Sequence, residues 1–427
     1  MFDIVIVGGG PGGSVCAAQL AERGHKLLVL ERETFPRFHL GESLLPSSMP
    51  IFESIGVLPE LSERFIHKFG ARFHLDTGAR QERYAFAQAF GVDESGRPAA
   101  GGSVPRFDHA FQVPRDEFDS VLLANAARKG AEVRHDWTVS RIAFEGTRAA
   151  GVVATDPGGK EHAIEARFVV DASGRDALLA GDRRDKSRID RLDKSAFYMH
   201  YRNVERQEGE RAGDIDIVVF DDGWFWMIPF KDGRTSVGAV VSNAWVKEHR
   251  GTADEMLERA IAGSPAAQKL LARAERMWPS ARAAADYSYR VGRPYGDGWI
   301  ALGDAGGFID PLFSSGVHIA ISGANRATPR IDEALRAGDV SEARFAPWAA
   351  EMKLGTDTFI DAVQAFYAGG LVRYLFAEKK HTFLRRSITS LLAGDVYSPD
   401  ARWIVDVRSR LREMAAPAFD PMPIVGV

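Results

Sequence analysis

Three glycines follow the first apolar stretch of the chain at a spacing that can bind a phosphate. DIVIV is continuous and apolar, as expected of a buried parallel strand, and Gly8, Gly10 and Gly13 come directly after it. They fit G-x-G-x-x-G, which permits a tight turn and lets a pyrophosphate approach the N-terminus of the next helix. KLLVL predicts a second strand, and Glu31 at its end can accept hydrogen bonds from ribose hydroxyls. The pattern predicts a dinucleotide site, with a glycine-rich turn that holds no ligand as the alternative.

A second glycine region near residue 300 decides which dinucleotide is expected. In GDAGGFIDPLFSSG, Asp304 follows a predicted buried strand, where an acid can hold the ribityl hydroxyls of a flavin. Together with DASGR (171–175), this stretch resembles the FAD-binding pattern of the flavin monooxygenases that include para-hydroxybenzoate hydroxylase. A second G-x-G-x-x-G for a separate nicotinamide domain is absent from the sequence. Bound FAD is therefore predicted, and a reduced nicotinamide must bind transiently or act through another protein.

The stretch DDGWFWMIPFKDG contains two tryptophans two positions apart. Side chains alternate along a strand, so Trp224, Trp226 and Ile228 share one face and Phe225 and Met227 share the other. Aromatic residues on a strand are ordinarily core. The alternative hypothesis is that the indoles form a wall between a cofactor and a substrate, and we favour this wall.

Four stretches, taken together, resemble the flavin-dependent halogenases, especially those that act on phenols, pyrroles or carrier-bound aromatics. They are FPRFHLGESLLPSS (35–48), KFGARF (68–73), WFWMIP (224–229) and PLFSSGVHIA (311–320). The resemblance implies that reduced FAD and O₂ give a flavin C4a-hydroperoxide, which oxidises a halide to hypohalous acid. It also implies an electron-rich aromatic substrate, free or tethered to a carrier protein or peptide, and a separate flavin reductase.

The resemblance places a guiding lysine at Lys68, which would direct hypohalous acid by hydrogen bonding or by forming a haloamine. A lone lysine at a loop end is ordinarily a solvated surface residue. Inside an apolar channel its pKa would fall and its amine could act as a nucleophile. Lys68, Trp224 and Trp226 are the catalytic candidates.

Further cofactor contacts are expected from the same resemblance. Glu42 and Ser43 belong to the GES loop, which in the family runs past the flavin, and Arg115 lies in VPRDEFD, a motif near the flavin in this superfamily. An alternative for Arg115 is a surface pair with Asp119 at i+4, which contributes little. The full set of cofactor-binding candidates is Gly8, Gly10, Gly13, Glu31, Arg32, Glu42, Ser43, Arg115, Asp304 and Gly316.

The residues before the helix that follows PLF offer backbone N–H groups to an anion. Those of Ser315 and Gly316 can hold a halide, or contact the flavin pyrimidine oxygen and N1. Alternatively, the serines at this point only cap the helix. Tryptophan halogenases carry a glutamate just ahead of the matching residue, where this chain has Leu312 and Phe313. Free tryptophan is therefore a poor substrate, and a phenol or pyrrole is preferred.

Three other functions share part of these motifs. The first is a flavin monooxygenase that hydroxylates an aromatic ring, including a tryptophan side chain in a peptide or protein. The second is an FAD oxidoreductase like the geranylgeranyl reductases, against which the tryptophan pair counts. The third is a non-catalytic flavoprotein that serves as a binding partner.

Composition excludes several other classes. The 427 residues carry a net charge of −4 and include one cysteine, Cys16, so neither a nucleic-acid protein nor a disulfide framework is indicated. No metal-ligand spacing occurs. No apolar run approaches the roughly 18 to 20 residues of a membrane span. A signal peptide is not recognisable at the N-terminus. A cytoplasmic location is predicted.

The predicted strands and helices that must position these residues alternate regularly in only part of the sequence. We predict an α/β fold in which a Rossmann-like FAD-binding domain is interleaved with a β-sheet substrate domain and followed by a C-terminal helical segment. The expected boundaries are 1–75, 106–190 and 281–338 for the FAD-binding domain, 76–105 and 191–280 (with the WFWMIP strand) for the substrate domain, and 339–427 for the helical segment.

Overall fold

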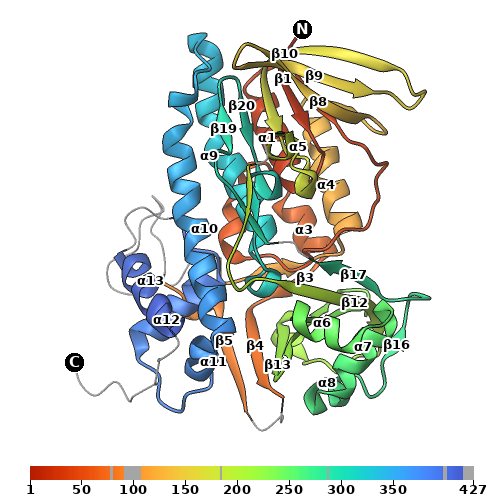
Figure 1. Ribbon diagram of the computed structural model, residues 1–427, viewed down its shortest axis with the longest axis vertical. Helices are drawn as coiled ribbons and strands as arrows, with labels where there is room; N and C mark the ends of the chain where they lie inside the picture. The colour runs from red at the N-terminus through yellow and green to blue at the C-terminus, as the bar shows by residue number, and fades with distance from the viewer. Residues whose placement is uncertain (77–79, 91–106, 183–184, 286–287, 398–401, 417–427) are drawn as a thin grey trace.

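The computed structural model describes residues 1–76, 80–90, 107–182, 185–285, 288–397 and 402–416. Figure 1 shows two sheets at opposite ends of the molecule, with α9 (Ser315–Ala337) and α10 (Ala346–Tyr367) along one side. In this described part of the chain, every helix is too short or too polar to cross a membrane.

The first sheet is built on five parallel strands in the order β20-β10-β1-β2-β7. Helices α1, α4 and α9 pack on one face, and an antiparallel meander of β8, β9 and the first half of β10 covers the other. The bounds are β1 Phe2–Val7, β2 Leu27–Leu30, β7 Glu132–Arg134, β8 Thr138–Glu145, β9 Arg148–Thr155, β10 Glu161–Asp171, β20 Trp299–Ala301, α1 Pro11–Glu22 and α4 Arg115–Arg128.

The register of the parallel strands brings three distant loops to one edge. Val7 lies opposite Asp171, and Asp171 lies opposite Ala301, so β1, β10 and β20 end at the same level. Ligands of open α/β sheets bind outside such carboxyl ends. The segments that follow these strands in the sequence therefore meet at one place.

The second sheet has the order β16-β12-β15-β14-β13-β4-β5, with β17 beside β12. All of its pairs are antiparallel except β13 with β4, which joins residues 215–219 to 71–75. Its strands are β4 Gly70–Leu75, β5 Gln81–Ala85, β12 Lys194–Arg202, β13 Ile215–Phe220, β14 Gly223–Pro229, β15 Thr235–Ser242, β16 Glu275–Arg276 and β17 Arg282–Ala285.

The two faces of β14 contact different parts of the protein, as the alternation predicts. Phe225 and Met227 pack with α6 (Asn243–His249), α7 (Ala253–Ala262) and α8 (Pro265–Leu270). Trp224, Trp226 and Ile228 belong to the cluster that includes the C-terminal helices. The predicted division of these five side chains is confirmed.

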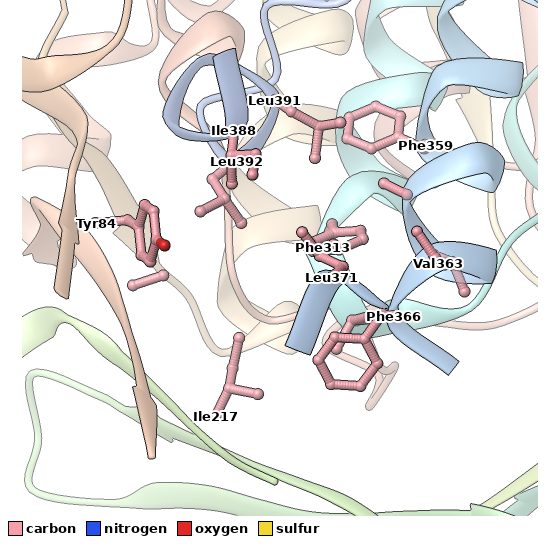
Figure 2. Packing of buried hydrophobic residues seen from close by; sticks show 14 of the residues in the cluster. Tyr84, Ile217, Phe313, Phe359, Val363, Phe366, Leu371, Ile388, Leu391 and Leu392 are labelled. Atoms are coloured by element: carbon pink, nitrogen blue, oxygen red, sulfur yellow. The ribbon is translucent and has the colours of Figure 1, made fainter. Parts of the chain in front are cut away.

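The C-terminal helical region consists of α10, α11 (Gly370–Leu375), α12 (Thr382–Leu392) and α13 (Arg402–Met414). Figure 2 shows Tyr84 and Ile217 of the second sheet facing apolar side chains from α10, α11 and α12. The α/β fold with two interleaved sheets and a helical C-terminal segment is thus the one predicted from sequence. Helices α7 and α8 are separate elements, because the side chain of Ser264 caps a new helix that begins at Pro265.

We predict that Gly238→Ala destabilises the protein through Trp226. Gly238 lies opposite Trp226 in the β14–β15 pair, and a Cβ atom there would overlap the indole ring. Overpacking of this kind costs about 1–3 kcal/mol. Denaturant unfolding should show that loss, whereas Gly263→Ala, whose Cβ would have its nearest contacts at 3.5 Å, should not. Equal losses in both variants would contradict the overlap.

Candidate active site

A cavity of about 690 Å³ opens where the carboxyl ends of the first sheet face the second sheet. Its lining combines the glycine turn, the end of β2, the GES loop, the tryptophan face of β14 and the start of α9. Of the predicted site residues, it contains Gly8, Gly10, Gly13, Glu31, Arg32, Glu42, Ser43, Arg115, Trp224, Trp226, Asp304, Ser315 and Gly316.

The glycine turn leaves room for a phosphate at the N-terminus of α1. Gly8 has φ +101°, and a Cβ there would overlap the carbonyl oxygen of Ala172. A Cβ on Gly13 would overlap the carbonyl of Gly8, so this glycine is required for the helix to approach the turn. Gly10 faces the cavity and would meet only Arg37, at 3.7 Å. The turn fits the pyrophosphate of a dinucleotide.

Glu31 both shapes this turn and lines the cavity. Its Oε2 atom accepts a hydrogen bond of 2.7 Å from the Gly9 N–H, and its Oε1 atom accepts one of 3.0 Å from the Glu33 N–H. The side chain is buried at the end of β2, where ribose hydroxyls are bound in this fold. Arg32 is exposed at the rim and forms an ion pair with Asp176.

Arg115 is a buried anchor for the loop that precedes the GES sequence. It forms the i+4 pair with Asp119 that was the alternative, with Nε–Oδ1 at 2.7 Å and Nη2–Oδ2 at 2.9 Å. The pair is buried rather than on the surface, and its remaining Nη1 donates to the carbonyl of Leu40. Bidentate buried pairs of this type hold their geometry firmly. Arg115 therefore both lines the cavity and fixes the chain beside it.

The GES loop is held from its other side by a histidine. Oε1 of Glu42 lies 2.8 Å from Nε2 of His200 on β12, and both side chains are buried. The backbone of Ser43 bridges to Gln112, but its buried hydroxyl finds no hydrogen-bond partner within the described residues. Because Ser43 lines the cavity, that hydroxyl can bind a polar atom of a ligand.

The second glycine region forms the remaining side of the cavity. Asp304 lies in the turn after β20, and burial raises the pKa of its carboxyl to about 6, although Arg115 and Arg175 oppose this rise. Ser314 has φ +55°, and its side chain makes no capping hydrogen bond to α9 within the described structure. The capping alternative for this serine is therefore not supported. Ser315 and Gly316 form the first turn of α9 at the cavity.

Lys68 is the one catalytic candidate that does not line this cavity. It ends β3 (Ile66–Lys68) and is 1 % exposed. Its Nζ atom donates a 3.0 Å hydrogen bond to the carbonyl of Leu44 and lies 5.2 Å from the centre of the Phe86 ring. Burial lowers its pKa to about 7, although the charge of Asp214 works in the opposite direction.

The segment 41–45, which we call the partition segment, thus lies between the cavity and the buried side chain of Lys68. Glu42 and Ser43 face the cavity, and the carbonyl of Leu44 binds the Lys68 amine. A residue 24 positions from Lys68 in the chain is therefore its direct partner. Lys68 therefore contacts the site through its hydrogen bond to this segment and does not itself line the cavity.

Sequence inspection missed several residues of the site. Arg37 lines the cavity, and its Nη1 atom lies 3.2 Å from the carboxylate of Asp119. His200 carries no local signal, because it lies 158 residues from Glu42. Over the part of the chain that is described, no group of three or more His, Cys, Asp or Glu side chains could hold a metal ion.

The chain matches two protein-family models and a named enzyme in sequence. A family model described as tryptophan halogenase matches residues 95–370, and one described as FAD dependent oxidoreductase matches residues 3–181. The chain is 32% identical to a 1H-pyrrole-2-carbonyl-[peptidyl-carrier protein] chlorinase from Pseudomonas fluorescens, over 98% of this chain and 94% of that protein.

Solved structures agree with these sequence matches. A flavoprotein/dehydrogenase from Cytophaga hutchinsonii superposes with a TM-score of 0.86 at 30% identity, over 97% of this chain and 98% of that one. The flavin-dependent brominase Bmp2 superposes with a TM-score of 0.84 at 25% identity, over 96% and 98%. The residues at the cavity fit FAD, and the cofactor prediction is confirmed.

We predict that Glu31→Ala weakens FAD binding. Loss of the carboxylate removes its hydrogen bond with the Gly9 N–H and the acceptor that we expect for the ribose hydroxyls, and charge-assisted hydrogen bonds of this kind account for about 10- to 100-fold in affinity. Titration of the apoprotein with FAD, followed by flavin fluorescence, measures the change. Glu132→Ala, on exposed β7, serves as the control. Equal affinities for both variants would show that Glu31 does not contact the cofactor.

Proposed function

This chain belongs to the tryptophan halogenase family of FAD-dependent oxidoreductases, and from that premise we propose that it chlorinates or brominates a pyrrole ring carried on a peptidyl carrier protein. The observation that carries the proposal is the buried amine of Lys68 behind the partition segment. A separate flavin reductase supplies the reduced flavin, and we infer that the reaction takes place in the cytoplasm.

In this proposal some residues act at the cavity, and Lys68 acts from its buried position beside the partition segment. When bound and reduced, FAD with O₂ supplies the electrophilic oxygen that oxidises a halide. The glycine turn and Glu31 bind the cofactor, and Ser315 and Gly316 offer backbone N–H groups to the halide or to the flavin edge. Trp224 and Trp226 close the cavity on the substrate side, so that only a small oxidant passes.

Lys68 receives that oxidant in a dry environment. With a pKa of about 7, its amine is present in both protonation states at neutral pH. The ammonium form can donate a hydrogen bond to hypohalous acid, and the neutral amine can attack the halogen and release water. Burial keeps bulk water from competing with the aromatic substrate.

Two observations support a carrier-bound pyrrole. The chlorinase and a brominase from Pseudoalteromonas luteoviolacea (29% identical) are both named for a 1H-pyrrole-2-carbonyl group on a peptidyl carrier protein. Leu312 and Phe313 are buried apolar residues, so no carboxylate is available at these two positions to assist attack by the less reactive benzene ring of an indole. Pyrrole is activated by its own nitrogen and does not need that assistance.

The decisive experiment distinguishes halogenation from hydroxylation. The FAD-loaded protein is reduced without oxygen and mixed with oxygenated buffer and carrier-bound pyrrole, with and without bromide. We expect a brominated product that requires bromide and O₂. A hydroxylated product that is indifferent to bromide would overturn the proposal and favour the monooxygenase alternative.

Lys68→Met provides the matched variant for this experiment. It should consume oxygen at the wild-type rate but lose product by about 100-fold or more, because the flavin cavity is intact and the guiding amine is gone. Lys379→Met, at an exposed position, should behave as wild type. Retained product in Lys68→Met would remove Lys68 from the mechanism.

We also predict a pH-dependent stability difference between wild type and Lys68→Met. The pKa of Lys68 falls from 10.5 to about 7 on folding, so between these values the unfolded chain holds a proton that the folded chain lacks. Wild-type stability therefore rises with pH relative to Lys68→Met, by up to about 1.4 kcal/mol per pH unit. Denaturant unfolding at pH 7, 8 and 9 measures the difference. A constant difference would mean that the amine ionises normally.

A further inference from the structure

The indole of Trp224 is anchored from outside its own sheet. A buried tryptophan needs an acceptor for its ring N–H. Trp226 finds one on the neighbouring strand, where Nε1 donates to the hydroxyl of Ser236 at 3.1 Å. Nε1 of Trp224 instead donates to the hydroxyl of Tyr367 at 2.9 Å, 143 residues along the chain. The two indoles of the wall are thus held by different parts of the protein.

Tyr367 is the last residue of α10, in the C-terminal helical region. Its hydroxyl has a single hydrogen, which it donates to Oδ2 of Asp310 at 2.7 Å. The oxygen therefore accepts from Trp224 while the hydrogen is committed to Asp310. The orientation of the Tyr367 hydroxyl is therefore fixed by both neighbours.

Asp310 connects this hydroxyl to the turn that precedes α9. Its side chain is buried, and its Oδ1 accepts the backbone N–H of Leu312 at 3.0 Å. Leu312 lies in the short turn that leads to Ser315, where α9 begins at the cavity. One tyrosine hydroxyl therefore links the wall strand, the C-terminal helix and the segment that offers N–H groups to the flavin or halide.

The surroundings suit a carboxylate at Asp310. The Nζ atom of Lys194 lies 4.1 Å from the centre of the Tyr367 ring and attracts the Asp310 charge. Burial raises the pKa of Asp310 to about 6, and the hydrogen bonds from Tyr367 and Leu312 oppose that rise. Above this pH the Asp310 carboxylate accepts hydrogen bonds from both the Tyr367 hydroxyl and the Leu312 N–H, so the Tyr367 oxygen remains oriented to accept from Trp224.

We propose that Tyr367 is a positioning residue of the active site, whose hydroxyl fixes the Trp224 indole against the flavin cavity and so makes the C-terminal helical region part of the wall. The consequence for halogen transfer rests on the proposed function. A wall indole free to rotate leaves a path by which hypohalous acid escapes, so less of the oxidant reaches the substrate.

The test measures how oxidant is divided. In Tyr367→Phe we expect wild-type FAD content and oxygen consumption, but a ratio of halogenated product to hypohalous acid captured in solution that is lower by about fivefold, the effect of one lost hydrogen bond. Tyr374→Phe is the matched control, because that hydroxyl donates to the carbonyl of His381 at 3.3 Å, within the same region. An unchanged ratio in Tyr367→Phe, or an equal fall in Tyr374→Phe, would overturn the proposal.

A double-mutant cycle shows whether Tyr367 acts through Trp224. Trp224→Phe keeps a ring but lacks the N–H, so it should lower the ratio to a similar extent, and the double variant should show little further loss. If the fall in the double variant instead equals the product of the two single falls, Tyr367 does not act through Trp224. Asp310→Asn supplies the same comparison if Tyr367→Phe does not fold.

A second readout does not depend on halogenation. In the apoprotein, the contribution of Trp224 to the fluorescence is obtained by subtracting the emission spectrum of a Trp224→Phe variant from that of the same protein with Trp224. Compared with wild type, this Trp224 contribution should differ in emission wavelength or in quenching when Tyr367→Phe is present. It should be the same as in wild type when Tyr374→Phe is present. A fluorescence change without any halogenated product from wild type would refute the proposed function and leave the positioning role standing. No fluorescence change would refute the positioning role.

Discussion

The arrangement of the site depends on one buried ion pair, Arg115 with Asp119. Its bidentate geometry leaves one guanidinium nitrogen to hold the carbonyl of Leu40, directly before the partition segment. A buried guanidinium without this carboxylate would be strongly destabilising, so the pair and the loop persist together. Glu42, bound by His200, holds the same segment from the second sheet. The thin layer between the flavin cavity and Lys68 is therefore fixed from both domains.

The flavin cavity and the surroundings of Lys68 differ in the polar groups that they offer. The cavity of about 690 Å³ presents glycines, backbone N–H groups and a few carboxylates, which suit a charged dinucleotide. Lys68 is buried beside the Phe86 ring, and there the loss of hydration lowers its pKa and shifts the lysine towards its neutral form. This difference supports the proposal that the flavin reacts in the cavity and that Lys68 guides the oxidant from outside it.

The C-terminal helices pack against the tryptophan face of the second sheet. They belong to the same buried cluster as Trp224 and Trp226. Figure 2 shows Ile217 of the second sheet facing apolar side chains from these helices. Packing alone would leave the indole N–H groups without acceptors, which costs free energy in an apolar interior. Ser236 and Tyr367 supply those acceptors. The helical region is therefore bound to the site by polar contacts as well as by apolar area.

The sequence alone determined the features that depend on local periodicity or local spacing. It gave the buried strands, the glycine turn that closes against Gly8, the division of β14 into two faces, the i+4 partner of Arg115 as an alternative and the FAD cofactor. Tertiary structure decided every contact between segments far apart in the chain. Glu42 with His200, Lys68 with Leu44, and Trp224 with Tyr367 are separated by 158, 24 and 143 residues. Such pairs leave no pattern in one sequence, because they arise only when parallel strands and packed helices bring loop ends together. The exclusion of Lys68 from the flavin cavity is the clearest case, since its burial and lowered pKa follow from the packing of three separate segments.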